Sequence, residues 1–125
     1  TPIAEDVAWA RQVLLAGHDL AFVPEAVVMH SHARSAAYEF ERTALLHHEL
    51  HRLFGVRTIP TWRALTRSVA STTALHLQLW RQAPPGVPVE SLPRALALAV
   101  AWPLGQFVGG RRAVRGTPVI RSGRV

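Results

Sequence analysis

Residues 5–32 read EDVAWARQVLLAGHDLAFVPEAVVMHSH, and this stretch decides the fold that the sequence predicts. Its first part, from about residue 4 to residue 16, has the apolar spacing of a helix, with two acidic residues in the first turn and a glycine stop. Two short runs rich in strand formers follow, at residues 20–23 and 27–30, separated by a Pro-Glu-Ala break. The stretch therefore predicts a helix followed by two short strands, which is an α/β pattern.

A long helix is predicted next, over residues 35–54, with Gly55 closing its end. His47 and His51 share one of its faces, which we interpret as solvated. The zinc-protease pattern His-Glu-x-x-His is not met, because Arg52 stands where the second histidine is needed. We expect a different face of this helix to pack against the strands, and that face carries Leu46, Leu50 and Leu53.

The remainder of the chain, residues 56–125, is predicted to be mainly helical. Helices are expected over residues 62–81 and 92–108, the second capped by Ser91 and kinked at Pro103, with a stiff Pro-rich linker over residues 83–88. No charge appears between Ala95 and Val108, but these residues are fewer than the ~20 that span a bilayer. That run predicts a buried or membrane-surface helix, and a loosely ordered tail is expected over residues 111–125.

Charge is distributed unevenly along the chain. The 125 residues include 14 Arg, no Lys and no Cys, so a disulfide framework, a thiolate zinc site and a cysteine nucleophile are all excluded. Residues 1–55 hold four Arg against seven Asp and Glu, whereas residues 56–125 hold ten Arg against one Glu. The asymmetry suggests that the second part lies near an anionic partner, although a coding bias toward Arg would explain much of the Arg use. No nucleic-acid motif is present, and no nucleic-acid partner is expected.

Three runs in the opening stretch occur together: EDVAWA at residues 5–10, LAGH at 15–18 and FVPEAVVMHSH at 22–32. They combine an acidic pair that opens a Trp-containing helix, a helix-ending Gly, a Pro-Glu-Ala turn and a strand that ends in His-Ser-His. In this combination the chain resembles the latter part of the inverting family 2 glycosyltransferases, and is most similar to their bacterial rhamnosyltransferase-like branch. The resemblance covers residues 5–55 and is weaker beyond, at GQFVGGRR, residues 105–112.

The resemblance implies a division of the chain. Residues 1–55 would be the C-terminal, acceptor-side half of a GT-A (Rossmann-like) catalytic domain, and residues 56–125 a helical, basic C-terminal region. The nucleotide-binding strands and the Asp-x-Asp motif, which holds the metal and the donor diphosphate in this family, are not found in these residues. We therefore expect the chain to be part of an enzyme and to be inactive in isolation.

The resemblance also assigns roles near the start of the chain. The family's general base is the second residue of the acidic pair, here Asp6, with Glu5 beside it, and Trp9 is expected to contact the acceptor. The helix dipole and free amide donors stabilise a carboxylate in a first helical turn, which also fits a purely structural role for the pair. Two departures from the family pattern, Ala8 for an acidic residue and Gln12 for an Arg, put packing and acceptor contacts in doubt more than the reaction class.

His30 stands where the family places a metal-binding histidine at the end of the second strand. His32 lies two residues on and would point to the same side of a continuing strand, where it would support the metal or touch the diphosphate. Imidazole together with carboxylate and phosphate oxygens suits Mn²⁺, and Mg²⁺ acceptably. A divalent metal is therefore the expected cofactor, with a structural role for the two histidines as the alternative.

The function that follows from the resemblance is hexosyl transfer with inversion, from a nucleotide-sugar donor to a cell-envelope glycan or a polyprenyl-linked acceptor. The branch resembled suggests rhamnose from a dTDP donor. The expected location is cytoplasmic, peripheral on the inner face of the cell membrane, because the second part of the chain is basic and apolar. Two alternatives stay open: a basic module that binds anionic lipid or nucleic acid, and an inactive truncated remnant.

Overall fold

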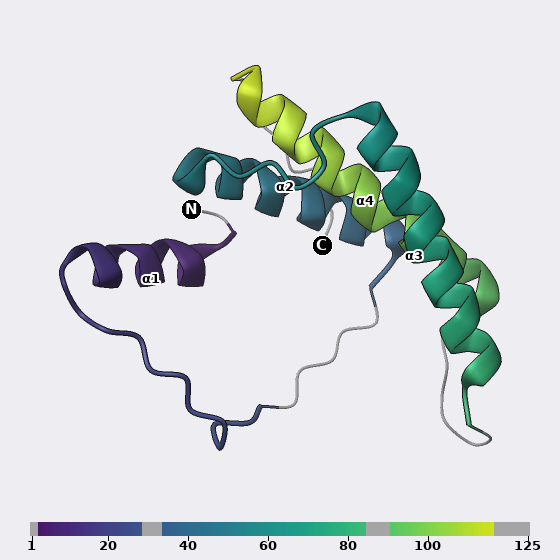
Figure 1. Ribbon diagram of the computed structural model, residues 1–125, viewed down its shortest axis with the longest axis horizontal. Coiled ribbons are helices and arrows are strands. Elements are labelled where there is room, and N and C mark those ends of the chain that lie inside the picture. The colour runs from purple at the N-terminus through teal and green to yellow at the C-terminus, as the bar shows by residue number, and fades with distance from the viewer. Residues whose placement is uncertain (1–2, 29–33, 85–90, 117–125) are drawn as a thin grey trace.

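The computed structural model describes residues 3–28, 34–84 and 91–116 (Figure 1). Over these ranges the chain forms four helices and no strand: α1 (Glu5–Leu15), α2 (Ala36–Phe54), α3 (Trp62–Gln82) and α4 (Leu92–Val114). The α/β prediction, and with it the GT-A (Rossmann-like) architecture of the first part, is therefore wrong for the described chain. Its architecture is all-helical.

The two predicted strands show why the α/β prediction fails. Residues 20–23 and 27–28 lie in a loop without regular structure, on either side of a turn at residues 24–25, where the Ala26 amide donates to the Val23 carbonyl oxygen at 3.1 Å. A strand forms only when a neighbouring strand accepts and donates its backbone hydrogen bonds. No described segment pairs with these residues, so their β-propensity produces no sheet.

The helices, in contrast, begin close to where the sequence predicts, and α1, α2 and α3 also end within about one residue of their predicted ends, whereas α4 runs beyond its predicted end at residue 108. The Ser35 hydroxyl accepts a hydrogen bond from the Tyr38 amide at 3.2 Å and caps α2. The Thr61 hydroxyl does the same for α3, from the Ala64 amide at 3.1 Å. Gly55 ends α2 in the left-handed region at φ 69°, which a residue with a Cβ atom rarely adopts.

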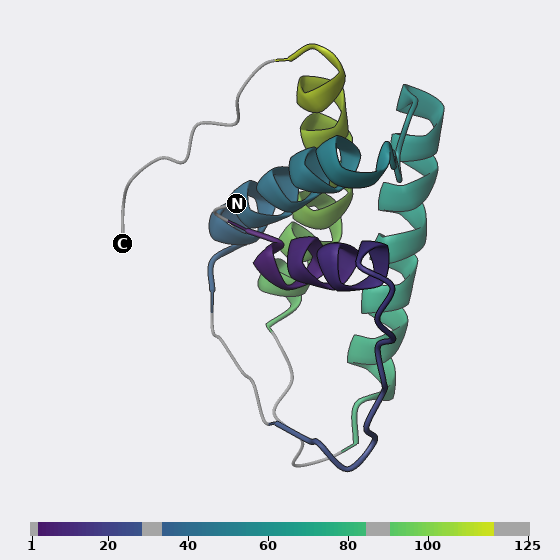
Figure 2. The same ribbon diagram turned by 90° about the vertical axis from the view of Figure 1, so that its left-hand side faces the viewer.

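Helix α4 occupies the centre of the fold and packs against both α2 and α3 (Figures 1 and 2). The prediction of a buried helix over residues 95–108 is confirmed, and Pro103 lies fully buried inside the helix without ending it. Residues 111–114 continue the helix, so the loose tail predicted from residue 111 is wrong there. The rest of that tail, residues 117–125, and residues 85–88 of the linker lie outside the described ranges.

Two glycines set the close contact between α4 and α2. A Cβ atom added to Gly105 would lie 2.8 Å from the Phe40 carbonyl oxygen and 2.8 Å from the Thr43 Cβ atom. One added to Gly109 would overlap the backbone carbonyl of Ala44. Small residues on both helices therefore allow the two backbones to approach closely.

This contact also corrects the expected orientation of α2. Residues that face α4 include Thr43 and Ala44, which are buried, and helical spacing places His47 and His51 on the same side. The leucine face that was predicted to pack against strands is only half-buried. The histidine face is not solvated either, because it belongs to the side of α2 that meets α4.

The densest apolar cluster joins the α2–α3 loop to α3 and α4. Ile59, Leu65 and Phe107 are buried in it, and Val69 and Leu104 are among the apolar residues packed around them. Among the residues that the structure describes, no helix combines the length and the hydropathy needed to cross a bilayer.

Candidate functional site

The residues predicted to do the chemistry lie at the start of α1. Glu5 and Asp6 form its first turn, and both side chains are exposed. Trp9 follows one turn later with 60% of its surface exposed. Residues three and four positions apart lie on the same side of a helix, so the indole shares an open face with both carboxylates. The structure thus brings together the predicted base, its acidic neighbour and the predicted acceptor contact.

The backbone that leads into this turn is unusual. Ala4, the N-cap residue, adopts a left-handed conformation at φ 63° and ψ 29°, and it is buried. The Asp6 Oδ1 atom accepts a hydrogen bond from the Val7 amide at 2.8 Å, so the carboxylate satisfies one of the free donors of the helix start. Asp6 Oδ2 accepts no hydrogen bond from any described residue. The Asp6 side chain is exposed at this N-terminal helix turn, with Oδ2 unpaired among the described residues.

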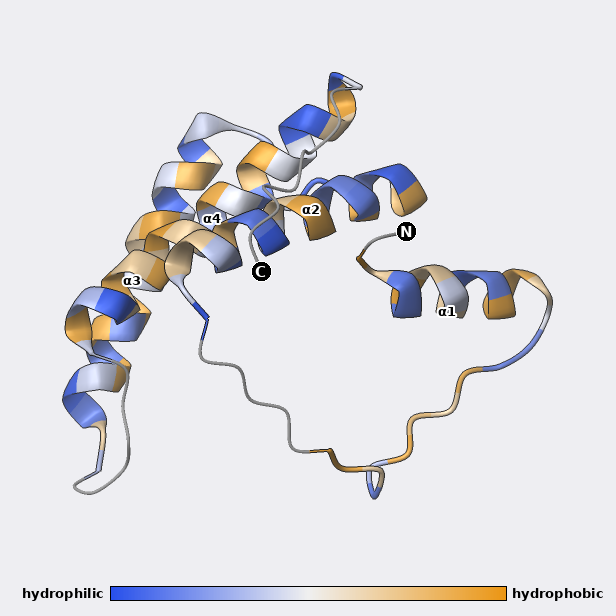
Figure 3. Cartoon of the chain, turned by 180° about the vertical axis from the view of Figure 1, so that it is seen from behind, coloured by the Kyte–Doolittle hydropathy of each residue, from blue (hydrophilic) through white to orange (hydrophobic). Residues whose placement is uncertain are grey.

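A large apolar surface continues from α1 into the loop that follows it. Phe22 has 89% of its surface exposed, and much of residues 20–28 is coloured as hydrophobic in Figure 3. Contiguous exposed apolar surface of this kind marks a contact with another polypeptide or ligand. The exposed large apolar residues of the region are Trp9, Leu14, Leu15, Leu20, Phe22, Val23, Val27 and Val28.

The predicted metal ligands, His30 and His32, lie outside the described residues. Within the described ranges, no group of three or more His, Cys, Asp or Glu side chains is arranged to hold a metal ion. The donor set around the acidic pair is carboxylate only, since Glu5 and Asp6 have no described imidazole beside them. The structure therefore assigns no ligand set to the expected metal, and no reaction step is derived through it.

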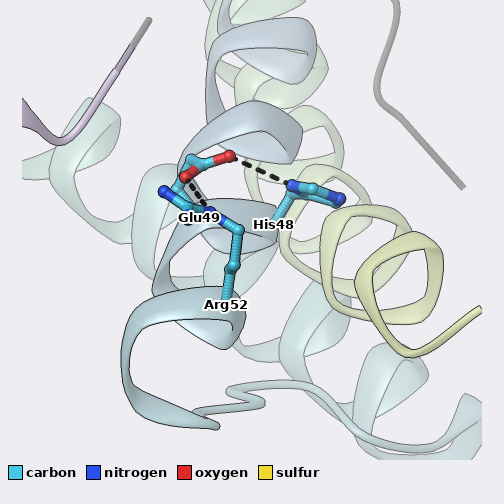
Figure 4. Close-up of polar contacts among 3 residues, drawn as sticks. All are labelled: His48, Glu49 and Arg52. Atoms are coloured by element: carbon cyan, nitrogen blue, oxygen red, sulfur yellow. Dashed lines mark hydrogen bonds and ion pairs between the residues drawn. The ribbon is translucent and has the colours of Figure 1, made fainter. Parts of the chain in front are cut away.

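Three polar residues of α2, His48, Glu49 and Arg52, form hydrogen bonds with one another (Figure 4). The buried Glu49 side chain accepts a hydrogen bond from the Arg52 Nε atom at 2.8 Å, and its other oxygen lies 3.3 Å from His48 Nδ1. Both carboxylate oxygens therefore have partners. Glu49 balances Arg52 locally, and this network is structural.

The other two histidines of α2 contact the α4 side of the fold. His47 Nδ1 lies 3.1 Å from the Thr58 hydroxyl, and burial lowers the pKa of His47 below its ordinary value. The His51 Nδ1 atom is buried and has no hydrogen-bond partner. The His47 side chain therefore couples α2 to the α2–α3 loop.

Sequence reasoning missed a second site, where the first turn of α3 meets the last turns of α4. The Arg111 guanidinium lies 5.2 Å from the centroid of the Phe107 ring and 5.8 Å from that of Trp62, and the two rings are 4.5 Å apart. Arg57 of the α2–α3 loop lies beside Gly110 and donates to the Pro60 carbonyl oxygen at 2.9 Å. The count of Arg residues after position 55 predicted the charge, but only the fold shows which of them gather.

A cavity of about 380 Å³ opens on the C-terminal half of α3. Among the described residues, its lining comes from one helix and includes none of the predicted site residues: Ala74, Leu77, Gln78, Arg81 and Gln82. Side chains from a single helix do not surround a ligand, so few polar groups converge on this cavity. We assign no ligand to it.

Comparison with protein-family models, with curated proteins and with solved structures finds no match for this chain.

Proposed function

We propose that this chain is the acceptor-side part of an inverting glycosyltransferase that uses a nucleotide-sugar donor. The acceptor would be a cell-envelope glycan or a polyprenyl-linked sugar, and rhamnose is the sugar proposed for transfer. The proposed location is the cytoplasmic face of the cell membrane. The motif resemblance over residues 5–32 supports this reaction class, and the start of α1 holds the described residues on which the proposal rests.

One observation carries the proposal: an open carboxylate and an exposed indole share one face at the start of α1. Sugars bind to aromatic faces through their apolar C–H surfaces, while a carboxylate accepts hydrogen bonds from their hydroxyl groups. Asp6 and Trp9 supply this pair of contacts, since both are exposed and three residues apart. An acceptor sugar stacked on Trp9 would bring a hydroxyl group within reach of Asp6.

The proposed chemistry is a single displacement. Asp6 Oδ2 accepts the proton of the acceptor hydroxyl while that oxygen forms a bond to the anomeric carbon of the donor. The bond between this carbon and the diphosphate breaks on the opposite face, and the nucleoside diphosphate leaves with the electron pair. Attack opposite the leaving group inverts the anomeric configuration. Asp6 lies in the first turn of α1, where the positive end of the helix dipole interacts favourably with a carboxylate.

The donor side of the reaction needs groups beyond those described. Mn²⁺ or Mg²⁺ would neutralise charge on the leaving diphosphate, and His30 and His32 remain the proposed ligands from this chain. The exposed apolar surface of α1 and residues 20–28 is the proposed contact with the donor-binding half, because it is uncovered in this chain. By itself, the 125-residue chain is expected to show no sugar transfer.

The decisive experiment replaces the base. A polypeptide that joins residues 1–125 to a nucleotide-sugar-binding half is assayed for release of nucleoside diphosphate from dTDP-, UDP- and GDP-sugars. Asp6→Asn, which is nearly isosteric, should lower kcat by ~10²-fold or more and leave the donor KM unchanged. Asp19→Asn is the matched control, since Asp19 is also exposed but lies outside the resembling motifs. Full turnover in Asp6→Asn would remove the assignment of the base.

A binding measurement on the chain itself tests the acceptor contact. Titration with a rhamnose-containing oligosaccharide should shift the NMR signal of the Trp9 indole N–H, and Trp9→Ala should abolish binding. Trp80→Ala is the control, because Trp80 is also exposed but lies near the end of α3. An equal loss of binding in both variants would show that the sugar does not select the α1 face.

The alternative function, a module that binds an anionic partner, has separate support. Arg111, which lies over the Trp62 and Phe107 rings, and Arg57, which lies beside Gly110, favour it. That surface is compatible with the transferase proposal and does not depend on it.

A further inference from the structure

The surface where α3 begins and α4 ends is rich in arginine and also carries exposed apolar side chains. We call it the basic end and define it by five arginines and three apolar residues: Arg57, Arg63, Arg111, Arg112 and Arg115, with Val56, Trp62 and Val114. Figures 1 and 2 both show the first turn of α3 and the last turns of α4 at the same end of the helical body. The contacts of Arg111 with Trp62, and of Arg57 with Gly110, join the two helices and the loop there.

None of the five arginines of the basic end forms an ion pair with a described Asp or Glu. Arg57, Arg63, Arg112 and Arg115 are exposed, and Arg111 is half-buried against two aromatic rings. Among the described residues after position 55 there is no Asp or Glu. The one buried carboxylate of α2, Glu49, is already paired with Arg52. The basic end therefore carries an uncompensated positive potential that attracts an anionic surface.

Its apolar side chains indicate which kind of anionic surface. Trp62 has 63% of its surface exposed although it packs against Phe107, and Val56 and Val114 are exposed as well. Binding to phosphate groups alone gains nothing from exposed aliphatic side chains. At a bilayer surface, in contrast, Trp lies at the headgroup level, aliphatic groups enter the acyl boundary and Arg side chains reach the phosphates.

We propose that the basic end docks on the surface of a bilayer that contains anionic phospholipid. Arg57, Arg63, Arg112 and Arg115 contact lipid phosphates, and Trp62 enters the interface between them. Arg111 holds the Trp62 ring through its cation–π contact, so the indole is already positioned before docking. This proposal does not rest on sugar transfer, and the vesicle experiment contains neither donor nor acceptor.

The first test measures partition of the 125-residue chain onto vesicles of phosphatidylcholine with 30% phosphatidylglycerol. The variant Arg63→Glu with Arg112→Glu removes one arginine from each helix of the basic end. Because each basic residue near an anionic membrane contributes about fivefold in partition, this variant should bind about 30-fold more weakly or worse. Wild-type binding should also fall as salt rises from 0.05 M to 0.5 M.

The matched control reverses two arginines elsewhere, as Arg11→Glu with Arg81→Glu. Both are exposed, on α1 and on the last turn of α3, and the change in net charge is the same. Less than about threefold weakening is expected, since these residues lie outside the basic end. Circular dichroism checks that both double variants keep their helix content.

The second test follows the indole. Vesicle addition should shift tryptophan emission to shorter wavelength, and Trp62→Phe should remove most of the shift while it keeps a ring against Phe107. Four results would overturn the proposal: no binding to the anionic vesicles, equal binding to pure phosphatidylcholine, equal weakening in both double variants, or an unchanged shift in Trp62→Phe. Tighter binding to a DNA duplex at equal phosphate concentration would assign the surface to nucleic acid instead.

Discussion

The two parts of this molecule use apolar side chains in opposite ways. In the body formed by α2, α3 and α4, the buried apolar residues gather on α4 where it packs against two neighbouring helices, while a few, such as Trp62 and Val114 at the basic end, are exposed. In α1 and residues 16–28, large apolar side chains are exposed, and the loop forms no regular structure. The first region satisfies its sequence pattern within the chain, whereas the second carries a pattern that needs a further surface.

Hydrogen bonding explains why the two regions differ. A helix satisfies its backbone groups from within, so α1 forms even where its neighbours contribute little packing. A strand leaves its backbone groups to a neighbour, so residues 20–23 and 27–28 stay irregular when none is present. The exposed apolar residues of α1 and residues 16–28 thus indicate contacts that are not made within the described chain, whereas the buried residues of the body indicate contacts that are.

The largest expected effect is on the free energy of unfolding. It compares one Phe→Ala substitution in the helical body with one in the loop that follows α1. Phe107 is 2% exposed at the centre of the body, and Phe107→Ala should lower the free energy of unfolding by about 3 kcal/mol or more. Phe22 is almost fully exposed, and Phe22→Ala should change it by less than about 0.5 kcal/mol. Urea unfolding followed by circular dichroism measures both. Similar losses in the two variants would show that residues 16–28 belong to the same cooperative unit.

The next effect concerns the close contact between α2 and α4. Gly109→Ala places a Cβ atom against the Ala44 carbonyl and should cost about 2 kcal/mol, because neither backbone can move away cheaply. Gly110→Ala is the matched control, since the nearest atom to its Cβ is Arg57 Cγ at 3.8 Å, an ordinary contact. That variant should be neutral or slightly stabilising, because Ala favours the helix. If both variants unfolded at the same denaturant concentration, the close approach would be wrong.

What the sequence predicted correctly is local. The helix starts near Ser35 and Trp62 and the helix end at Gly55 are encoded within a few residues of where they occur, whereas Ser91, the one cap predicted, lies at the N-cap position of α4 but makes no side-chain capping hydrogen bond. The exposed start of α1 with Glu5 and Asp6 is local as well, which is why the acidic pair lies where it was expected. The chemical roles of that pair stay predictions.

What the sequence did not predict depends on partners distant along the chain. The face of α2 that meets α4 is chosen by the fit of Thr43 and Ala44 to glycines of α4, and a leucine stripe does not reveal such a fit. The basic end needs the α4 turn around Arg111 to lie against Trp62, 49 positions earlier in the sequence. Charge counting located the excess of arginine but not the surface.

The helix caps are expected to have a smaller effect on the free energy of unfolding, and a third N-cap residue serves as the control. Ser35→Ala and Thr61→Ala each remove a side-chain acceptor from the start of a packed helix and should cost about 1 kcal/mol. Ser91 also stands at an N-cap position, on α4, but its side chain makes no capping hydrogen bond. Ser91→Ala should therefore cost only a few tenths of a kcal/mol in the same unfolding assay, by the same reasoning. An equal loss at all three caps would mean that residue type, and not the hydrogen bond, sets the effect.

The smallest expected effect is a pH dependence confined to the helical body. Burial lowers the pKa of His47, so the unfolded chain takes up a proton more readily than the folded one. The contribution of the neutral ring to stability is complete above the ordinary histidine pKa of about 6.5 and is lost as the pH falls from there toward the lower folded pKa.

Unfolding of wild type and His47→Gln between pH 7.5 and pH 5.5 measures this contribution. The glutamine side chain can still bond to the Thr58 hydroxyl, so His47→Gln should keep the contact and lose less stability on acidification than wild type. His18→Gln is the control in the other region, because His18 is exposed beyond the end of α1 and its variant should keep the wild-type pH profile. If His47→Gln and wild type lost stability in parallel, His47 would not be the source of the pH dependence.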